Sequence, residues 1–329
     1  MHDDNIIGDE TAARPRLAGV GGRFREANYR RLALRGFGIF LVAALLYYPA
    51  GMIYIHKIDD SLDLGVTIED GESLSVAVAA ALIERETDTH RWTANDPFFL
   101  PGAALDNMPN FQRGIVYALS RFAIEMSDQI GRIRGSSQVD ADLDNAAGRL
   151  KYPGDIWYFD FATSLAPTST SEEQYRSARR AFLSYNKRLA AGEAKFERRA
   201  DNLQATLERI ASDLGSQSAG IDHAIGNGGW LIDFEADDIF FQTKGRLYGY
   251  YHLLNAFRVD FSRIIKEREL GPAWDLMLAS MRHAAEMDPL VVVNGAPDGQ
   301  MLPSHLAAQG FYLLRARTQL KEIANILLK

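Results

Sequence analysis

The sequence predicts an all-α protein in which a single N-terminal transmembrane helix is followed by an extracytoplasmic helical bundle with long helices. Residues 36–55, GFGIFLVAALLYYPAGMIYI, contain no charged side chain. After them, apolar residues recur every three or four positions, the period of helices that pack at shallow angles in bundles. Strand-like alternation is nearly absent, because Leu290–Val293 is the only β-like run and is too short for a sheet.

Residues 36–55 are predicted to cross a membrane as a helix. At about 1.5 Å per residue the segment spans roughly 30 Å, the thickness of the hydrocarbon core of a bilayer. Unpaired backbone groups cost several kcal/mol in lipid, so the segment must be helical there. A secretory signal peptide is the alternative interpretation. The apolar run is too long for a signal core, however, and no small-residue cleavage site comes before His56 and Lys57.

The charges on the two sides of this segment predict its orientation. Residues 1–35 carry seven arginines, whereas Lys57 is followed by Asp59, Asp60 and Asp63. Because basic residues stay on the cytoplasmic side, we expect a cytoplasmic N-terminus and a main domain outside the cytoplasm. The basic tail would also be attracted to anionic lipids at the cytoplasmic face, by roughly 1 kcal/mol for each arginine near the surface.

The composition excludes several classes of protein. The chain has 329 residues, no cysteine and a net charge of −7. After residue 35 there are 29 basic and 38 acidic side chains, a balance that repels nucleic acid. The lack of cysteine excludes disulfides, thiolate chemistry and cysteine-rich zinc sites. A main domain of this kind must be held together by its apolar core.

The first half of the main domain is predicted to alternate helices with aromatic loops. We expect a disordered basic tail over residues 1–35, a linker over 56–72 and one helical domain over 73–329. Ser73 can cap a first helix that ends near Thr89. The further elements predicted in this half are a proline-rich loop over 90–109, a helix over 110–134, a short helix from Ser136 to Leu150 and a second aromatic loop over 152–167.

The second half contains the longest predicted helices, because no proline occurs between Pro167 and Pro272. Ser171-Glu-Glu-Gln174 is a capping-box pattern. The apolar stripe over 172–225 slips near Gly192, so this stretch is either a tight αα-hairpin or one long helix with a stutter. Three later helices are predicted over 239–270, from Pro272 to about Met287, and from Ser304 to the C-terminus.

Three stretches of the chain resemble a known family. They are WTANDPFFLPGAALDNMPNFQRG (Trp92 to Gly114), GRIRGSSQVDADLDNAAGRL (Gly131 to Leu150) and LAAGEAKFERRADNLQATLERIASDLGS (Leu189 to Ser216). They are similar to the bacterial family catalogued as domain of unknown function 2333, over most of residues 36–329. The resemblance implies a bacterial inner-membrane protein with its main domain in the periplasm. It implies no activity, cofactor or catalytic residue.

One group of polar residues is the best candidate for a binding site. It flanks the predicted helix over 110–134 at both ends and mixes charges with amides, which can grip a carboxylate, a sugar or a peptide. The alternative is that these side chains satisfy backbone groups in the proline-rich loops. The candidate binding residues are Asp106, Asn107, Asn110, Gln112, Arg132, Arg134, Ser136 and Asp140.

Other patterns carry weaker chemical signals, and we expect no catalytic residue, no metal and no cofactor. Asp140, Asp142 and Asp144 resemble the start of a calcium loop, but the glycine and glutamate that should follow are missing. No two of the seven histidines have the spacing of a metal pair. The carboxylates of residues 233–238 resemble a glycosidase pair, but they fit the first turn of a helix better. Tyr248, Tyr250 and Tyr251 fit ordinary packing.

The sequence favours a non-catalytic scaffold or accessory subunit of a cell-envelope complex, with other envelope proteins as partners. The heptad-like stripes, the missing catalytic motifs and the lack of an output domain support this interpretation. An envelope hydrolase acting on cell-wall polymer and a ligand-binding sensor are the alternatives. We also expect most rings of the two aromatic loops to be core, with Asp106, Asn107 and Arg134 lining a groove beside them.

Overall fold

The computed structural model describes residues 20–131, 139–160, 165–227, 233–297 and 302–329, and divides at Ala50 into two compact units. The first helix, α1 (Val20–Ile55), contains Pro49. Within the described residues, Tyr29–Ile55 is the one helix long and apolar enough to cross a membrane, and its most apolar window is not buried by the chain. The helix begins well before Gly36 because intrahelical hydrogen bonding does not stop where the apolar run stops.

The second unit is helical, which confirms the predicted fold class. The one β-type pairing among the described residues is an isolated bridge between Asn294 and Ser304. Two α-helices continue without a break as π-helical turns, labelled η1 and η3 below. The elements are α2 (Leu74–Glu84), η1 (Arg85–Thr89), the 3₁₀ turn η2 (Pro101–Ala104), α3 (Asn107–Glu125), η3 (Met126–Ile130), α4 (Ala141–Leu150), α5 (Ser171–Ala190), α6 (Ala200–Asn227), α7 (Phe234–Asp260), α8 (Ser262–Glu267), α9 (Gly271–Ala285) and α10 (His305–Leu327).

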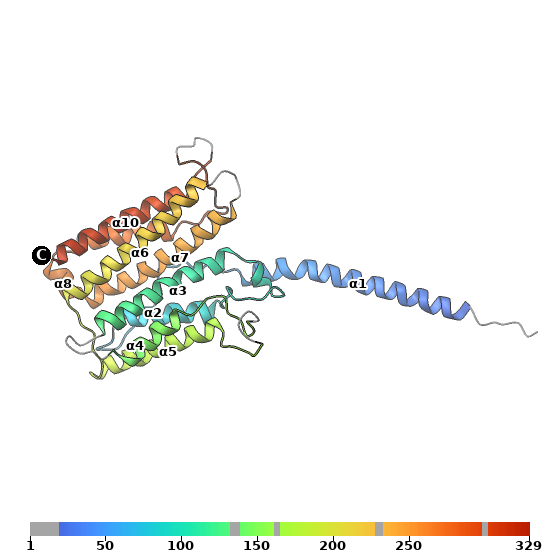
Figure 1. The fold of residues 1–329 in the computed structure, drawn as a ribbon, viewed down its shortest axis with the longest axis horizontal. Helices are drawn as coiled ribbons and strands as arrows, with labels where there is room; N and C mark the ends of the chain where they lie inside the picture. Colours follow the sequence, from blue (N-terminus) through green and yellow to red (C-terminus); the bar gives the residue numbers. More distant parts are fainter. Residues whose placement is uncertain (1–19, 132–138, 161–164, 228–232, 298–301) are drawn as a thin grey trace, which may run out of the picture. The chain divides into compact units, whose positions relative to one another are not determined.

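The helices of the second unit are arranged around the pair α3 and α7 (Figure 1). On one side, α2, α4 and α5 pack together and against this pair, and on the other side α6, α9 and α10 do the same. The two central helices cross at glycines, since a Cβ added to Gly245 would lie 2.0 Å from the Phe111 carbonyl oxygen. A Cβ on Gly114 would lie 2.3 Å from the Gln242 carbonyl oxygen, so the two backbones touch.

Side-chain caps fix where the helices start, as the sequence predicts for several of them. The side chains of Ser73, Asp233 and Ser304 accept a backbone N–H at the starts of α2, α7 and α10. The capping box of α5 lies one residue earlier than predicted, with Thr170 as the cap and Glu173 as its partner. Ser171 instead donates to the Pro153 carbonyl oxygen, 2.7 Å away, and so holds the preceding loop.

Both predictions for residues 172–225 are wrong. The chain leaves α5 through Gly192 at φ +76°, and α6 begins only at Ala200, so there is no continuous helix. The two helices are not a hairpin either, because α5 packs on α4 and α2, whereas α6 packs on α10 and α7. The residues between α5 and α6 also contact the rest of the domain. Phe196 is buried, and the Glu197 N–H donates to the Ile130 carbonyl oxygen.

Candidate functional site

The predicted polar residues do not gather in one place. Asp106, Asn107 and Asn110 lie at the start of α3, while Asp140 caps α4 at the other end of α3, roughly 28 Å away for a helix of this length. Gln112 lies inside the protein. Arg132, Arg134 and Ser136 lie outside the described residues, so a groove that includes Arg134 stays a prediction.

Asp140 has a structural partner. Its carboxylate accepts the backbone N–H of Asp142 at 3.0 Å, which caps α4. The guanidinium of Arg188, on α5, pairs with Asp140 at 2.7 Å and with Asp142 at 2.6 Å. The bidentate pairing ties α4 to α5, so Asp140 is used for packing. The alternative interpretation, in which these polar side chains satisfy backbone groups, therefore applies to Asp140.

The start of α3 meets the start of α7 in a group of carboxylates, Asp106, Asp237 and Asp238, which we call the acidic cluster. Asn110 donates its side-chain amide to Asp238, 2.6 Å away. The amide of Asn107, oriented to donate, reaches Asp237 and the Asp106 carboxylate. Burial, followed by the charges of Asp106 and Asp238, raises the pKa of Asp237 to about 6. A carboxyl that holds its proton close to neutral pH can act as a general acid.

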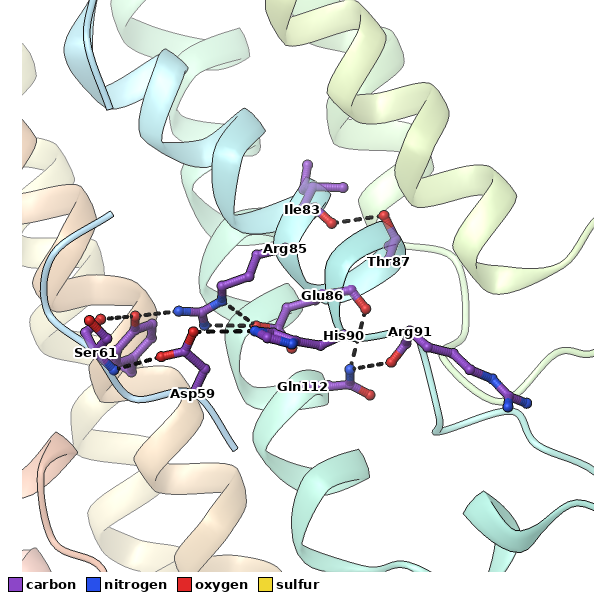
Figure 2. A network of polar contacts seen from close by, with 10 residues as sticks. Asp59, Ser61, Ile83, Arg85, Glu86, Thr87, His90, Arg91 and Gln112 are labelled. Carbon is purple, nitrogen blue, oxygen red and sulfur yellow. Dashed lines mark hydrogen bonds and ion pairs between the residues drawn. The ribbon is translucent and has the colours of Figure 1, made fainter. Parts of the chain in front are cut away.

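A second polar site joins the bundle to residues 57–66, a segment that we call the strap. Figure 2 shows Asp59 and Ser61 of the strap beside Arg85 and His90. His90 Nε2 lies 3.2 Å from Asp59 Oδ2. Burial alone would raise the pKa of Asp59, but the Ser61 N–H and the charge of Arg85 outweigh it and leave that pKa below its ordinary value.

The strap is also held by two residues of α7. Lys244 has a side chain that is 0% exposed, and its Nζ lies 2.8 Å from Asp60 Oδ2 and 3.5 Å from Asp288 Oδ1. The Tyr248 hydroxyl donates to the Ser61 carbonyl oxygen and accepts from Arg85 Nη1, both at 2.5 Å. We call Arg85, His90, Lys244 and Tyr248 the clamp. The linker predicted over residues 56–72 therefore contains a segment that is bound to the bundle, and the strap's Ile58, Leu62, Leu64 and Val66 pack on the core.

Gln112 stabilises the turn that carries the clamp. Its amide nitrogen donates to the carbonyl oxygens of Glu86, at 3.3 Å, and Arg91, at 2.9 Å (Figure 2). Its amide oxygen accepts from the N–H of Thr93 at 3.1 Å. Arg91 has φ +62°, a left-handed conformation that needs such support in a residue other than glycine. Gln112 thus closes the π-helical turn that carries Arg85 and His90.

Sequence reasoning missed the clamp, although one signal was present. Lys244, Tyr248 and His252 recur every four residues and form a polar stripe inside a helix that is otherwise apolar on its inner faces. The His252 ring packs against the Tyr248 ring at 4.4 Å, and burial together with the charge of Arg85 lowers the pKa of His252 to about 3. His252 is therefore neutral at physiological pH. The residues that contact this stripe lie in the strap, which is far away in the chain. No sequence pattern in the strap marks them.

The two aromatic loops also differ from the prediction. Trp92 is core: it is buried, donates to the Gly154 carbonyl oxygen at 2.8 Å and packs on Tyr175. Phe98 is 83% exposed and Phe99 is 47% exposed. Tyr158 and Phe159 are exposed as well. The expectation that most of these rings are core is therefore wrong.

The comparison with family models decides what the chain is related to. A model described as "Uncharacterized protein conserved in bacteria (DUF2333)" matches residues 72–234 and 229–329. The chain belongs to this family. The resemblance of the three stretches in residues 92–216 is thereby confirmed for the helical domain. No curated protein and no solved structure matches the chain. The family description names no activity, so a function for this DUF2333 protein has to be argued from its own geometry.

Proposed function

We propose that this protein is a single-pass inner-membrane protein whose helical domain lies in the periplasm as a non-catalytic scaffold or accessory subunit of a cell-envelope complex. The bacterial family, the candidate span and the arginines before it support the location. The N-terminus then lies in the cytoplasm, where the basic tail meets anionic lipids. Other envelope proteins are the expected partners.

The observation that carries the proposal is the way in which the strap is held. A tether between an anchor and a free domain would be solvated and polar. Here the chain that leaves the candidate span enters the core within a few residues, and Lys57 N–H already contacts Met108 Sδ at 3.3 Å. The ion pair of the buried Lys244 with the partly exposed Asp60, and the other residues of the clamp, then fix it to α7 and η1. A domain whose first segment is bound to its own core in this way offers a partner an ordered surface.

The polar groups of the described surface support a scaffold more than an enzyme. Several of the carboxylates and amides singled out in the sequence cap helices, pin loops or pair with arginines. One hollow, of about 620 Å³, lies between α6 and α10 next to Ser212 and Lys321 and is open to solvent. Deep, largely apolar pockets with convergent polar groups are the usual mark of small-molecule sites.

Affinity isolation of the full chain from detergent-solubilised membranes tests the scaffold role. We expect one or more envelope proteins to be recovered in stoichiometric amounts. A variant with a weakened strap, Asp60→Asn, should remain in the membrane fraction but retain less partner. The matched control is Asp63→Asn, which alters an exposed strap residue whose carboxylate contacts Gly65 N–H only locally. Recovery of the chain alone, from crosslinked as well as untreated membranes, would contradict the proposal.

Location is tested separately by reporter fusions. Alkaline phosphatase joined after Leu150 should be active, because that enzyme requires an oxidising compartment. A cytoplasmic reporter at the same point should be inactive. The opposite pair of results would place the domain in the cytoplasm.

An envelope hydrolase acting on cell-wall polymer is the second candidate, and the acidic cluster favours it. Asp237 has a pKa of about 6 and lies beside Asp238, so one carboxyl can be protonated while its neighbour is ionised. Purified chain should then release fragments from cell-wall polymer, and Asp237→Asn should abolish this release. If the wild-type chain and the Asp237→Asn variant both release nothing, the acidic cluster is not catalytic.

A further inference from the structure

The half-buried Trp157 joins the exposed rings of Phe98, Phe99, Tyr158 and Phe159 into one continuous group. Phe98 packs on Phe99 with ring centroids 5.5 Å apart, and Phe99 packs on Trp157 at 5.6 Å. Trp157 in turn contacts Tyr158 at 5.8 Å and Phe159 at 5.9 Å. These five residues, which we call the aromatic surface, come from loops that are far apart in the chain. Stacking across the two loops shows that the rings are arranged together and are not exposed one by one.

The aromatic surface lacks charge. Residues 97–104, PFFLPGAA, and residues 156–159, IWYF, contain no charged side chain. The carboxylate of the adjacent Asp96 is paired with Arg91 at 2.6 Å and is nearly buried. An exposed apolar patch of this kind marks a site that is covered by a partner or by lipid.

The position of the 97–101 loop indicates which occupant covers the surface. Pro101 lies against Gly51, because a Cβ added to Gly51 would be 2.3 Å from Pro101 Cγ. Gly51 belongs to the last turns of α1, which ends at Ile55, and these turns are part of the same compact unit as the bundle. Phe98 is three residues before Pro101 and therefore lies within about 10 Å of it. The aromatic surface thus starts within about 10 Å of a residue that lies against the last turns of α1.

We propose that the aromatic surface inserts into the bilayer interface, in the leaflet where α1 ends. The proposal rests on the membrane anchoring proposed above. Aromatic rings with a polar tip, such as Trp157 and Tyr158, prefer the headgroup level, and phenylalanines enter the adjacent acyl region. Asp155 and Asp160 flank the rings, so the attraction is hydrophobic and does not require anionic lipids.

Insertion would give the domain a second attachment to the membrane. The first attachment is the strap, which fixes the chain after α1 to the bundle through Lys244 and Tyr248. One attachment leaves the domain free to rotate about the axis of the span, whereas two attachments fix the face that it presents to partners.

Because the chain has no cysteine, one introduced cysteine can be labelled alone. We would attach an environment-sensitive fluorophore to Phe98→Cys in the full chain, in nanodiscs of phosphatidylethanolamine and phosphatidylglycerol. Quenching by lipids that carry a nitroxide near the headgroup then reports insertion, and iodide reports contact with water. Phe40→Cys, inside the apolar helix, is the membrane reference. Val259→Cys, exposed near the C-terminal end of α7, is the control for an exposed apolar residue away from the membrane.

We expect the label at Phe98→Cys to be quenched by the lipids about as strongly as that at Phe40→Cys, at low and at high salt, and to be protected from iodide. The label at Val259→Cys should show the reverse. Tyr158→Cys provides a second probe if Phe98→Cys unfolds the domain, which circular dichroism would show. Labels at residues 98 and 158 that behave like the label at 259, while the label at 40 is quenched, would overturn insertion and leave a protein partner as the occupant. An unquenched label at residue 40 would instead overturn the membrane anchoring itself.

Discussion

The acidic cluster and the clamp both involve α7, within about four turns of each other, but they treat charge in opposite ways. In the clamp, Lys244 is paired with Asp60 and Asp288, and Arg85 is paired with Glu86 at 2.7 Å. In the acidic cluster, three carboxylates lie close together and bond to amides, and the charge of Arg113 acts on Asp238. One region is compensated and buried, whereas the other combines like charges at the surface.

The charges of the clamp stabilise the structure, whereas the carboxylates of the acidic cluster can change their protonation state. Opposite charges brought together out of water stabilise one arrangement and are costly to separate. Like charges at the starts of two helices are tolerated because the helix dipoles and the amides offset part of the repulsion. Burial, together with the remaining repulsion from Asp106 and Asp238, raises the pKa of Asp237.

The largest expected effect comes from the helix crossing that lies between the two regions. Gly245→Ala would place a Cβ 2.0 Å from the Phe111 carbonyl oxygen, so α3 and α7 would have to separate. Because α3 supplies Asn110 to the acidic cluster and Gln112 to the turn of the clamp, both regions should be disturbed. We expect a loss of about 3 kcal/mol in the free energy of unfolding, measured by denaturant titration in detergent.

Gly148→Ala is the matched control for this substitution. Gly148 lies in α4 with nothing within 4 Å of an added Cβ. Alanine there should stabilise the domain by about 0.5–1 kcal/mol, because glycine is the poorer helix former. If the two substitutions had equal effects, the close contact between α3 and α7 would not be important for stability.

The next effect should come from the clamp. Asp60→Asn removes the nearest counter-charge of the buried Lys244 and leaves only Asp288, 3.5 Å away and largely exposed. We expect a loss of about 2 kcal/mol, smaller than for a fully buried pair because the Asp60 side chain is partly exposed. Thermal unfolding followed by circular dichroism measures it, with Asp63→Asn as the control within about 0.5 kcal/mol of wild type. A neutral result for both variants would mean that water replaces the lost carboxylate.

The smallest effect should come from the acidic cluster and should have the opposite sign. The pKa of Asp237 is raised in the folded protein from 3.8 to about 6, so folding favours the protonated form. The cost of ionising Asp237 is absent below pH 3.8, grows between pH 3.8 and 6, and is complete at pH 7. Asp237→Asn should therefore stabilise the domain by about 1 kcal/mol at pH 7, with solvent screening included. Near pH 4 the gain should disappear.

Denaturant titrations at pH 4 and pH 7 measure this pH dependence. Glu235→Gln is the control, since Glu235 is exposed in the same helical turn, and it should change stability little at either pH. An equal gain from Asp237→Asn at both pH values would show that the repulsion among the carboxylates is not its cause.

The elements of this protein could be predicted from sequence because their signals are local. The stripe of α10 is buried at the positions that the period predicts, Leu306, Leu313, Ala316, Leu320, Ile323 and Leu327. Ser73, Asp233 and Ser304 cap their helices because a short polar side chain can reach an unpaired N–H only a few residues away. The described members of the predicted candidate site lie apart because they flank one helix, and a helix places its two ends far apart.

By itself, the sequence determined the helices, most of their starts and the apolar segment that can cross a membrane. The tertiary structure alone decided which residues of the loops are covered. Trp92 and Phe98 lie in one loop and have similar hydropathy, yet Trp92 is core and Phe98 is exposed. Likewise, the strap meets Lys244 and Tyr248 across more than 180 residues of chain. Hydropathy measures the free energy of leaving water, whereas Trp92 is covered because folding brings Tyr175 and Gly154 against it.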